Sequence, residues 1–186
     1  MSLPKSARIV EVGPRDGLQN ESANLPPALR AELIQKLATC GHTHIEAGSF
    51  VNPKWVPQMQ GTDEVLGKLD LDAGIAYPVL VPNLKGLENA MAAGAKEIAV
   101  FGAASETFSQ KNINCSIDES IDRFAAVTRE ALDNDIKVRG YISCVMGCPY
   151  EGAFPSAPWN TSQNAWTRSV ATKFPSGTPS ARAIPS

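Results

Sequence analysis

The fold is predicted most directly from AYPVLVPNLKGLENAMAAGAKEIAVFGAA, residues 76–104. Its two apolar runs, at 76–82 and 97–104, are typical of buried strands, and residues 84–94 between them are predicted to form a helix. A strand, a helix and a second strand in this order predict a right-handed crossover between two parallel strands.

The same alternation continues on both sides of this stretch. Ser116 and Glu119 form a Ser-x-x-Glu capping box, which predicts the start of a helix. The series fits the first part of a (β/α)8 barrel better than a complete doubly wound sheet, so we expect an incomplete α/β TIM barrel of about five βα units. The further predicted strands are 7–12, 44–50 and 137–145, and the further predicted helices are 26–41, about 63–69, and 116–135.

Composition excludes several classes of protein. A net charge of −2 with mixed signs argues against nucleic-acid binding, and no apolar run is long enough to span a membrane. The first residues, MSLPKSARIV, lack the apolar core of a signal peptide. The four cysteines contain no C-x-x-C pair and are interpreted as reduced thiols, so we expect a cytoplasmic protein.

Polar residues follow the predicted strands at their carboxyl ends. They are Arg15–Asp16, Glu46–Ser49, Asn83–Lys85 and Ser105–Glu106. In parallel α/β folds this edge is where ligands bind. No glycine-rich dinucleotide or P-loop motif is present, so those two classes of ligand are disfavoured.

Five blocks of sequence stand in a familiar order: VEVGPRDGLQNE, SFVNPKWVPQM, YPVLVPNLKG, KEIAVFGAASETFSQKNINCSI and VRGYISCVMGCPYEG. Together they resemble 3-hydroxy-3-methylglutaryl-CoA (HMG-CoA) lyase, almost without a gap over residues 3–152. Related barrels that condense or carboxylate 2-oxo acids share an Arg-Asp-Gly core but usually lack this context. The resemblance implies a carbon-carbon lyase that cleaves HMG-CoA into acetyl-CoA and acetoacetate, usually in leucine breakdown.

The resemblance assigns roles at the first strand end. Arg15 is implied to bind substrate as a permanent cation facing the developing enolate oxygen, and Asp16 to be a ligand of Mg²⁺ or Mn²⁺. Glu46 is expected to orient Arg15 or the metal shell. The alternative is a surface ion pair in a loop. Full-length family members are expected to be homo-oligomers.

Five weaker candidates complete the predicted site. Gln19 and Ser49 are expected to contact the acyl group, and Lys85, Lys111 and Asn112 the phosphates or pantetheine of CoA. For each of them the alternative is a solvated or loop-stabilising residue.

The resemblance also implies what this sequence lacks. The family's His-x-His metal ligands, its metal-binding Asn and its catalytic Cys lie farther along the family chain than residue 152. The GCPY at 147–150 matches an earlier copy of the catalytic-cysteine motif, so Cys148 is not expected to be the catalytic thiol. The chain by itself is therefore expected to have no lyase activity.

Residues 153–186 change character abruptly. They are rich in Ser, Pro, Ala and Thr, contain no His, Cys, Asp or Glu, and are predicted to be a disordered tail beside the barrel segment 1–152. Read from the third base of each codon, TKFPSGTPSARA (172–183) can encode EISLGDTIGxG, which is similar to the family's sixth-strand motif. We therefore expect that the reading frame slips near Gly152–Phe154.

Three functional classes stay open for this chain. It is a lyase assembled with another polypeptide that supplies the missing strands, or an inactive product of a frameshifted gene, or a fragment that retains CoA binding. Acetoacetate release with Mg²⁺ separates the first class from the others, and CoA affinity separates the third from the second.

Overall fold

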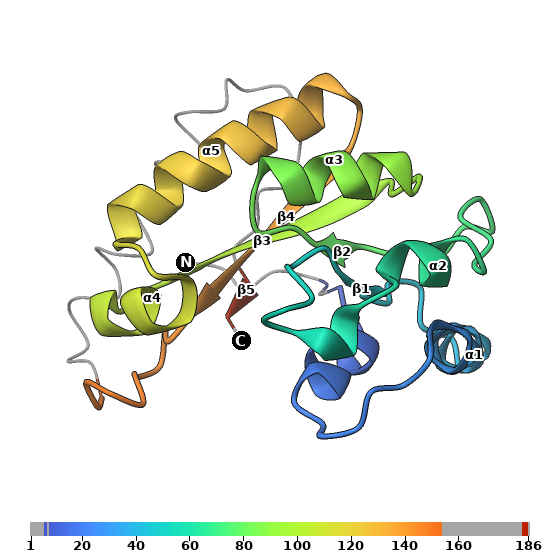
Figure 1. Cartoon of the computed structure of the whole chain (residues 1–186), viewed down its shortest axis with the longest axis horizontal. Coiled ribbons are helices and arrows are strands. Elements are labelled where there is room, and N and C mark those ends of the chain that lie inside the picture. The colour runs from blue at the N-terminus through green and yellow to red at the C-terminus, as the bar shows by residue number, and fades with distance from the viewer. Residues whose placement is uncertain (1–5, 7, 154–183, 186) are drawn as a thin grey trace. The chain divides into compact units, whose positions relative to one another are not determined.

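The computed structural model describes residue 6, residues 8–153 and residues 184–185 (Figure 1). These residues belong to two compact units. The first unit comprises residues 1–80 and 88–97, and the second comprises residues 81–87 and 98–186.

The first unit contains short parallel pairings between well-formed helices. Strand β1 pairs in parallel with β2, with Gly48 opposite Val79. Single parallel bridges join Glu11 to Ile45 and His44 to Ala76, so the strands expected at 7–12, 44–50 and 76–82 are present but shorter. The elements are η1 (Gly13–Gly17), α1 (Pro27–Thr39), β1 (Gly48–Ser49), η2 (Pro57–Met59), α2 (Thr62–Leu66) and β2 (Val79–Leu80).

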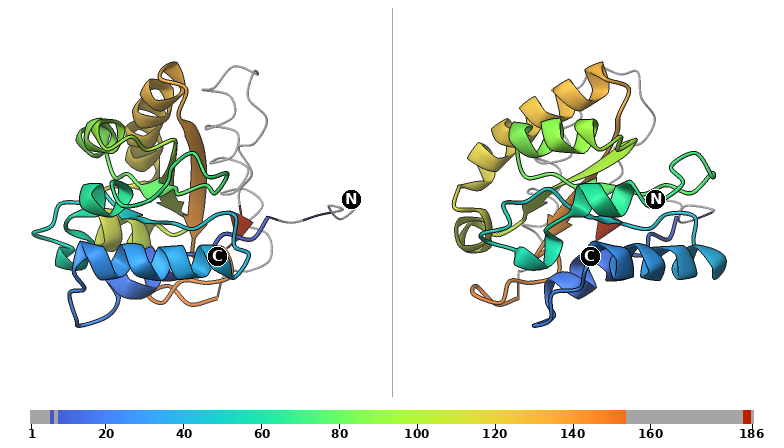
Figure 2. Two further views of the ribbon diagram at one scale, coloured as in Figure 1. Left: turned by 90° about the vertical axis from the view of Figure 1, so that its right-hand side faces the viewer. Right: turned by 45° about the vertical axis from the view of Figure 1, so that its right-hand side comes forward.

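Helix α1 confirms the helix predicted at 26–41. Pro27 occupies its first position, where a missing amide hydrogen is tolerated, and Ile34 is fully buried. Helix α1 lies beside α2 (Figure 2). Helix α2 begins after Gly61, which has a φ of 73° and would place a Cβ 2.7 Å from the ring of Pro27.

The strand–helix–strand stretch is formed by β2, α3 (Leu84–Ala92) and β3 (Glu97–Ala103), close to the predicted bounds. Leu87 and Ala90, one turn apart on α3, are both fully buried. The amide of Val81 donates to the carbonyl oxygen of Ala99 at 2.9 Å, so the chain after β2 pairs with β3.

The second unit orders its strands as β3, β4 (Lys137–Ser143) and β5 (Ile184–Pro185). Strand β4 pairs in parallel with β5, and α5 (Ile117–Asp133) packs against β4 (Figure 1). The rings of Phe101 on β3 and Phe124 on α5 lie 5.2 Å apart between centroids. Both bonds of the predicted capping box are present, from Glu119 N to Ser116 Oγ and from Ser116 N to the Glu119 carboxylate.

Helix α4 (Glu106–Ile113) was not predicted from the sequence. Ser105, directly after β3, caps it by accepting a hydrogen bond from the Phe108 amide at 3.0 Å. Asn114 ends it with a φ of 50°. Its eight residues show no clear apolar period, and the cap serine was the available signal.

The predicted tail falls almost wholly outside the described residues, apart from residue 153 and the two residues of β5. No helix in the described part of the chain is both long enough and apolar enough to cross a bilayer.

Candidate active site

Arg15 and Asp16 lie in η1, a tight turn of the first unit. The amides of Arg15, Asp16 and Gly17 converge on the carbonyl oxygen of Val12, at N···O distances of 3.1, 2.7 and 3.4 Å. The Arg15 side chain is only 10% exposed, whereas that of Asp16 is 54% exposed. The turn thus places a buried cation next to a solvent-facing anion.

Glu46 is the buried partner of Arg15. Its side chain is fully buried, and its Oε1 accepts a hydrogen bond from Arg15 Nε at 2.8 Å. The Glu46 amide donates to the carbonyl oxygen of Glu11 at 2.8 Å, which brings this carboxylate beside the segment that enters η1. Arg15 Nη1 also donates to Asp16 Oδ1 at 2.6 Å. One guanidinium therefore bridges two carboxylates.

This arrangement fixes a positive charge at the end of the paired segments. The guanidinium stays protonated at any ordinary pH, and breaking a buried ion pair typically costs about 3–5 kcal/mol. A cation held in this way does not have to reorganise when negative charge develops on a ligand oxygen. The geometry suits stabilisation of an oxyanion.

Gln19 and Ser49 lie in the same unit with different surroundings. Gln19 Oε1 is buried and has no hydrogen-bond partner among the described residues, so it is a candidate acceptor for a ligand. The Ser49 hydroxyl accepts from the Val51 amide at 3.2 Å and lies 3.4 Å from the Leu80 carbonyl oxygen. Its contact with an acyl group stays a prediction.

Lys85, Lys111 and Asn112 belong to the second unit. Lys85 is exposed in the first turn of α3, and the other two are exposed neighbours near the end of α4. Lys111 Nζ lies 3.9 Å from the centroid of the Tyr150 ring, a cation–π contact that sequence reasoning missed. Contact of these three residues with CoA stays a prediction.

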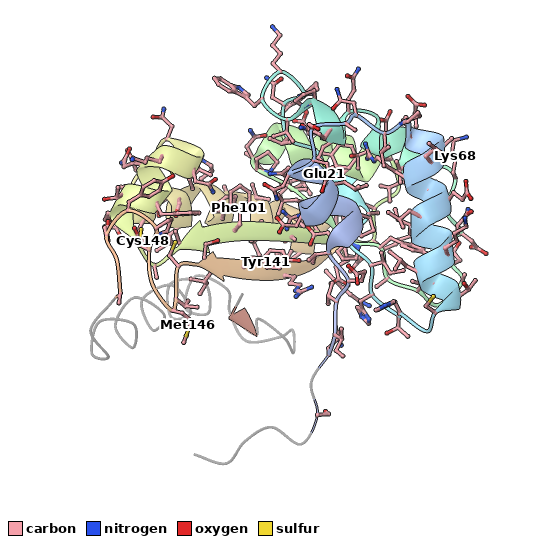
Figure 3. All side chains as sticks on the ribbon, turned by 90° about the horizontal axis from the view of Figure 1, so that it is seen from below. Glu21, Lys68, Phe101, Tyr141, Met146 and Cys148 are labelled. Atoms are coloured by element: carbon pink, nitrogen blue, oxygen red, sulfur yellow. The ribbon has the colours of Figure 1, made fainter. Side chains whose placement is uncertain are left out.

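Cys148 packs beside α4 in the second unit (Figure 3). The Ser105 hydroxyl donates to Cys148 Sγ at 3.0 Å, and the Tyr150 amide donates to the same sulfur at 3.4 Å. Burial raises the pKa of the thiol, but these hydrogen bonds outweigh burial and the net pKa is lowered. The contacts of this sulfur are with its own loop and with the cap of α4.

Cys144 behaves in the opposite way. Burial, followed by the neighbouring Cys148, raises the pKa of the Cys144 thiol to about 11. Its φ of 64° is left-handed, which is uncommon for a residue other than glycine. No sequence pattern predicts this difference between the two thiols.

Asp16 is the predicted metal ligand. Its exposed carboxylate is of the oxygen class that Mg²⁺ and Mn²⁺ prefer. Within the described residues no three His, Cys, Asp or Glu side chains gather in a way that could hold a metal ion. The described residues therefore do not by themselves supply three such ligands for a divalent ion.

A family model described as HMGL-like matches residues 6–160. The chain belongs to the HMGL-like family. One relative is the mitochondrial hydroxymethylglutaryl-CoA lyase of Macaca fascicularis, which is 57% identical over 156 residues, covering 84% of this chain and 48% of that protein. The HMGL-like chain thus spans about half the length of the curated relatives it matches.

Solved structures agree with this family. The hydroxymethylglutaryl-CoA lyase of Pseudomonas aeruginosa superposes with a TM-score of 0.83 at 50% identity, covering 91% of this chain and 56% of that one. An HMG-CoA lyase from Acinetobacter baumannii, in complex with coenzyme A and 3-methylmalate, gives 0.79 at 32% identity over 88% and 53% of the two chains. The predicted α/β fold, part of a TIM barrel, is confirmed for this HMGL-like chain.

Proposed function

We propose that this HMGL-like chain serves the cleavage of HMG-CoA into acetyl-CoA and acetoacetate. The proposal rests on one observation, the 2.8 Å hydrogen bond that Arg15 Nε donates to Oε1 of the buried Glu46. The identity with named lyases supports the same reaction class.

The reaction is a retro-aldol cleavage. A base removes the proton of the C3 hydroxyl, the C2–C3 bond breaks, and its electron pair moves onto the thioester as the enolate of acetyl-CoA. Protonation of that enolate gives acetyl-CoA, while C3 becomes the ketone of acetoacetate. Arg15 donates to the developing enolate oxygen, and Glu46 positions Arg15. Gln19 and Ser49 contact the acyl group.

The proposal includes a divalent cation and a CoA thioester. Asp16 is the ligand that this part of the chain offers to Mg²⁺ or Mn²⁺, which would supply positive charge near the acyl oxygens. The exposed cations Lys85 and Lys111, with Asn112, suit the phosphates and pantetheine of CoA. The described cysteines are all free thiols, which supports a reducing compartment such as the cytoplasm. Homo-oligomerisation is part of the same proposal.

We also propose that residues 1–152 form the barrel segment and that residues 153–186 are translated out of frame. Sequencing the gene across codons 150–184 tests this directly. Nucleotides that cannot encode EISLGDTIGxG in the shifted frame would contradict it.

The decisive experiment compares two proteins, the 186-residue chain and a frame-restored protein in which the family frame is read after Gly152. Each is incubated with HMG-CoA and Mg²⁺, and acetoacetate is measured. Release by the frame-restored protein supports the proposed function, and no release contradicts it. If the 186-residue chain releases none but binds CoA, it is a binding fragment, and if it does neither, it is an inactive product.

A further inference from the structure

The segment of residues 45–50, which contains β1, has one residue more than the segment of residues 76–80 with which it pairs. Three of its amides donate to carbonyl oxygens of the neighbouring segment at 2.8–3.0 Å. The acceptors advance by two residues at each step, whereas the donors advance by two and then by three. One extra residue is a β-bulge, a feature enriched beside active sites. The bonds are Ile45 to Ala76, Ala47 to Pro78 and Phe50 to Leu80.

Thr62 bonds the backbone at this bulge. The Ser49 amide donates to Thr62 Oγ1 at 3.2 Å. The single hydroxyl proton of Thr62 serves the carbonyl oxygen of Ser49 at 3.0 Å or that of Met59 at 2.8 Å. Because Thr62 is only 2% exposed, water does not compete for these bonds. A side-chain hydroxyl therefore stands in for the next strand as the partner of Ser49.

Arg30 holds Thr62 in place. Its side chain is fully buried, and its Nη2 donates to Thr62 Oγ1 at 3.1 Å. Its Nη1 donates to the carbonyl oxygens of Gln58 and Gln60 at 2.9 and 2.8 Å. In the described part of the chain no carboxylate forms an ion pair with Arg30, and burial lowers the pKa of the guanidinium. A cation buried among neutral oxygens is costly, so a specific role has to outweigh that cost.

Gly48 shows how closely this bracket fits the strand. A Cβ at Gly48 would lie 2.6 Å from Thr62 Oγ1 and 3.2 Å from Arg30 Nη2. Real Cβ atoms do not approach oxygen so closely. The oxygen here, Thr62 Oγ1, belongs to a buried side chain that three hydrogen bonds hold in place. The backbone of β1 therefore meets the bracket directly.

We propose that Arg30 and Thr62 form a positioning bracket that fixes the bulge and thereby sets the position of Ser49 at the carboxyl end of β1. Without the bracket, the Ser49 amide could replace the Phe50 amide as the donor to the Leu80 carbonyl oxygen, which would give a regular ladder. A shift of one residue swaps the faces of all side chains beyond it. The bracket would then decide which residue meets an acyl group, a consequence that rests on the proposed function.

The test follows single amides of the 186-residue chain by NMR hydrogen exchange. In Thr62→Val, which keeps the shape and removes the hydroxyl, Ser49 should exchange at least about fivefold faster. Ile45 and Ala47, bonded before the bulge, should stay within about twofold of wild type, and Thr62→Ser should restore the protection of Ser49. Thr128→Val, at a buried threonine of α5, is the matched control and should change none of them.

Three results would overturn the bracket. They are unchanged exchange of Ser49 in Thr62→Val, no rescue by Thr62→Ser, and equal acceleration of Ile45, Ala47 and Ser49. If Thr62→Val does not fold, Arg30→Lys replaces it, because a lysine cannot span the three acceptors. Faster exchange of the Ser49 amide in Arg30→Lys then supports the bracket, and unchanged exchange overturns it. None of these readouts needs turnover, so a failure of the proposed lyase reaction is seen separately in the acetoacetate assay.

Discussion

The strand ends of the two units both gather buried ionisable groups, yet they use them differently. In the first unit Arg15 is bonded to the fully buried Glu46, and its charge faces the exposed Asp16. In the second unit the Cys148 thiol accepts a hydrogen bond from Ser105, which also caps α4. The first arrangement keeps a charge pair out of water, whereas the second satisfies a hydroxyl and a sulfur where a loop meets a helix.

The difference distinguishes a candidate site of chemistry from a contact that stabilises local structure. Burying Arg15 and Glu46 together contributes little net stability compared with apolar residues, so folding alone gives no reason for the pair. Ser105 Oγ caps α4 by accepting from the Phe108 amide, and the same hydroxyl donates to Cys148 Sγ, so both bonds serve the start of the helix and the loop beside it. Chemistry is therefore expected at the first strand end and local stability at the second.

The substitution with the largest expected effect lies in the first unit. In the frame-restored protein, Arg15→Gln should lower acetoacetate turnover by about 10²–10³, because one preorganised charge at a developing oxyanion is lost. The control is Arg129→Gln, at an exposed position of α5, which should turn over as wild type does. Turnover of Arg15→Gln equal to that control would remove Arg15 from its role.

Glu46→Gln should then destabilise the chain by about 3 kcal/mol, since it leaves the buried guanidinium without its buried charged partner and only with the exposed Asp16. Urea unfolding of the 186-residue protein measures the change. Glu32→Gln is the matched control, because Glu32 forms an exposed ion pair with Lys36 at 2.7 Å, and no measurable change is expected there. Equal effects of the two substitutions would mean that the Glu46 pair is no more than a surface contact.

Sequence reasoning was strongest where patterns are local. The capping box at Ser116 and the apolar periods of α1 and α3 fixed those helices within a few residues. Helix α4 was missed because its capping serine lies immediately after a strand and its apolar residues lack a period.

The site was predictable as residue types but not as contacts. Arg15 and Asp16 are recognisable in the sequence as a charged pair after a predicted strand, and Glu46 lies at the end of the next predicted strand. The 2.8 Å bond between Arg15 and Glu46 joins residues 31 apart, and the bracket from Arg30 to Thr62 joins residues 32 apart. Such pairings depend on strand register and on a bulge, which single-residue patterns do not encode.

A smaller effect probes the second region. Cys148→Ala should cost about 1 kcal/mol, because the Ser105 hydroxyl loses its acceptor while the cap of α4 remains. Turnover of the frame-restored variant should stay at the wild-type level. Cys40→Ala, at an exposed thiol, is the control for stability. A loss of turnover that exceeds the loss of folded protein would make Cys148 part of the chemistry and would erase the contrast between the regions.

The raised pKa of Cys144, in the second unit, should make this thiol slow to react. With a pKa of about 11, Cys144 is almost entirely protonated at pH 8, so iodoacetamide should label it far more slowly than the exposed Cys40. Its labelling rate should keep rising as the pH is raised towards 11, and peptide mass spectrometry follows each thiol. A rate for Cys144 that levels off near pH 9 would contradict the raised pKa.

The smallest expected effect concerns a carboxylate that is exposed, in contrast to Glu46. Hydrogen bonds from the Ser116 amide, and then from its hydroxyl, hold the pKa of Glu119 below its ordinary value. Because the folded pKa is the lower one, the stability from this group is present above the unfolded pKa, near 4.5, and is lost as the pH falls through the folded value. Glu119→Gln should therefore have a slightly lower unfolding midpoint than wild type at pH 7, and the midpoints of the two proteins should converge in acid. A gap between wild type and Glu119→Gln that stays constant down to pH 2 would show that the capping box acts through geometry and not through charge.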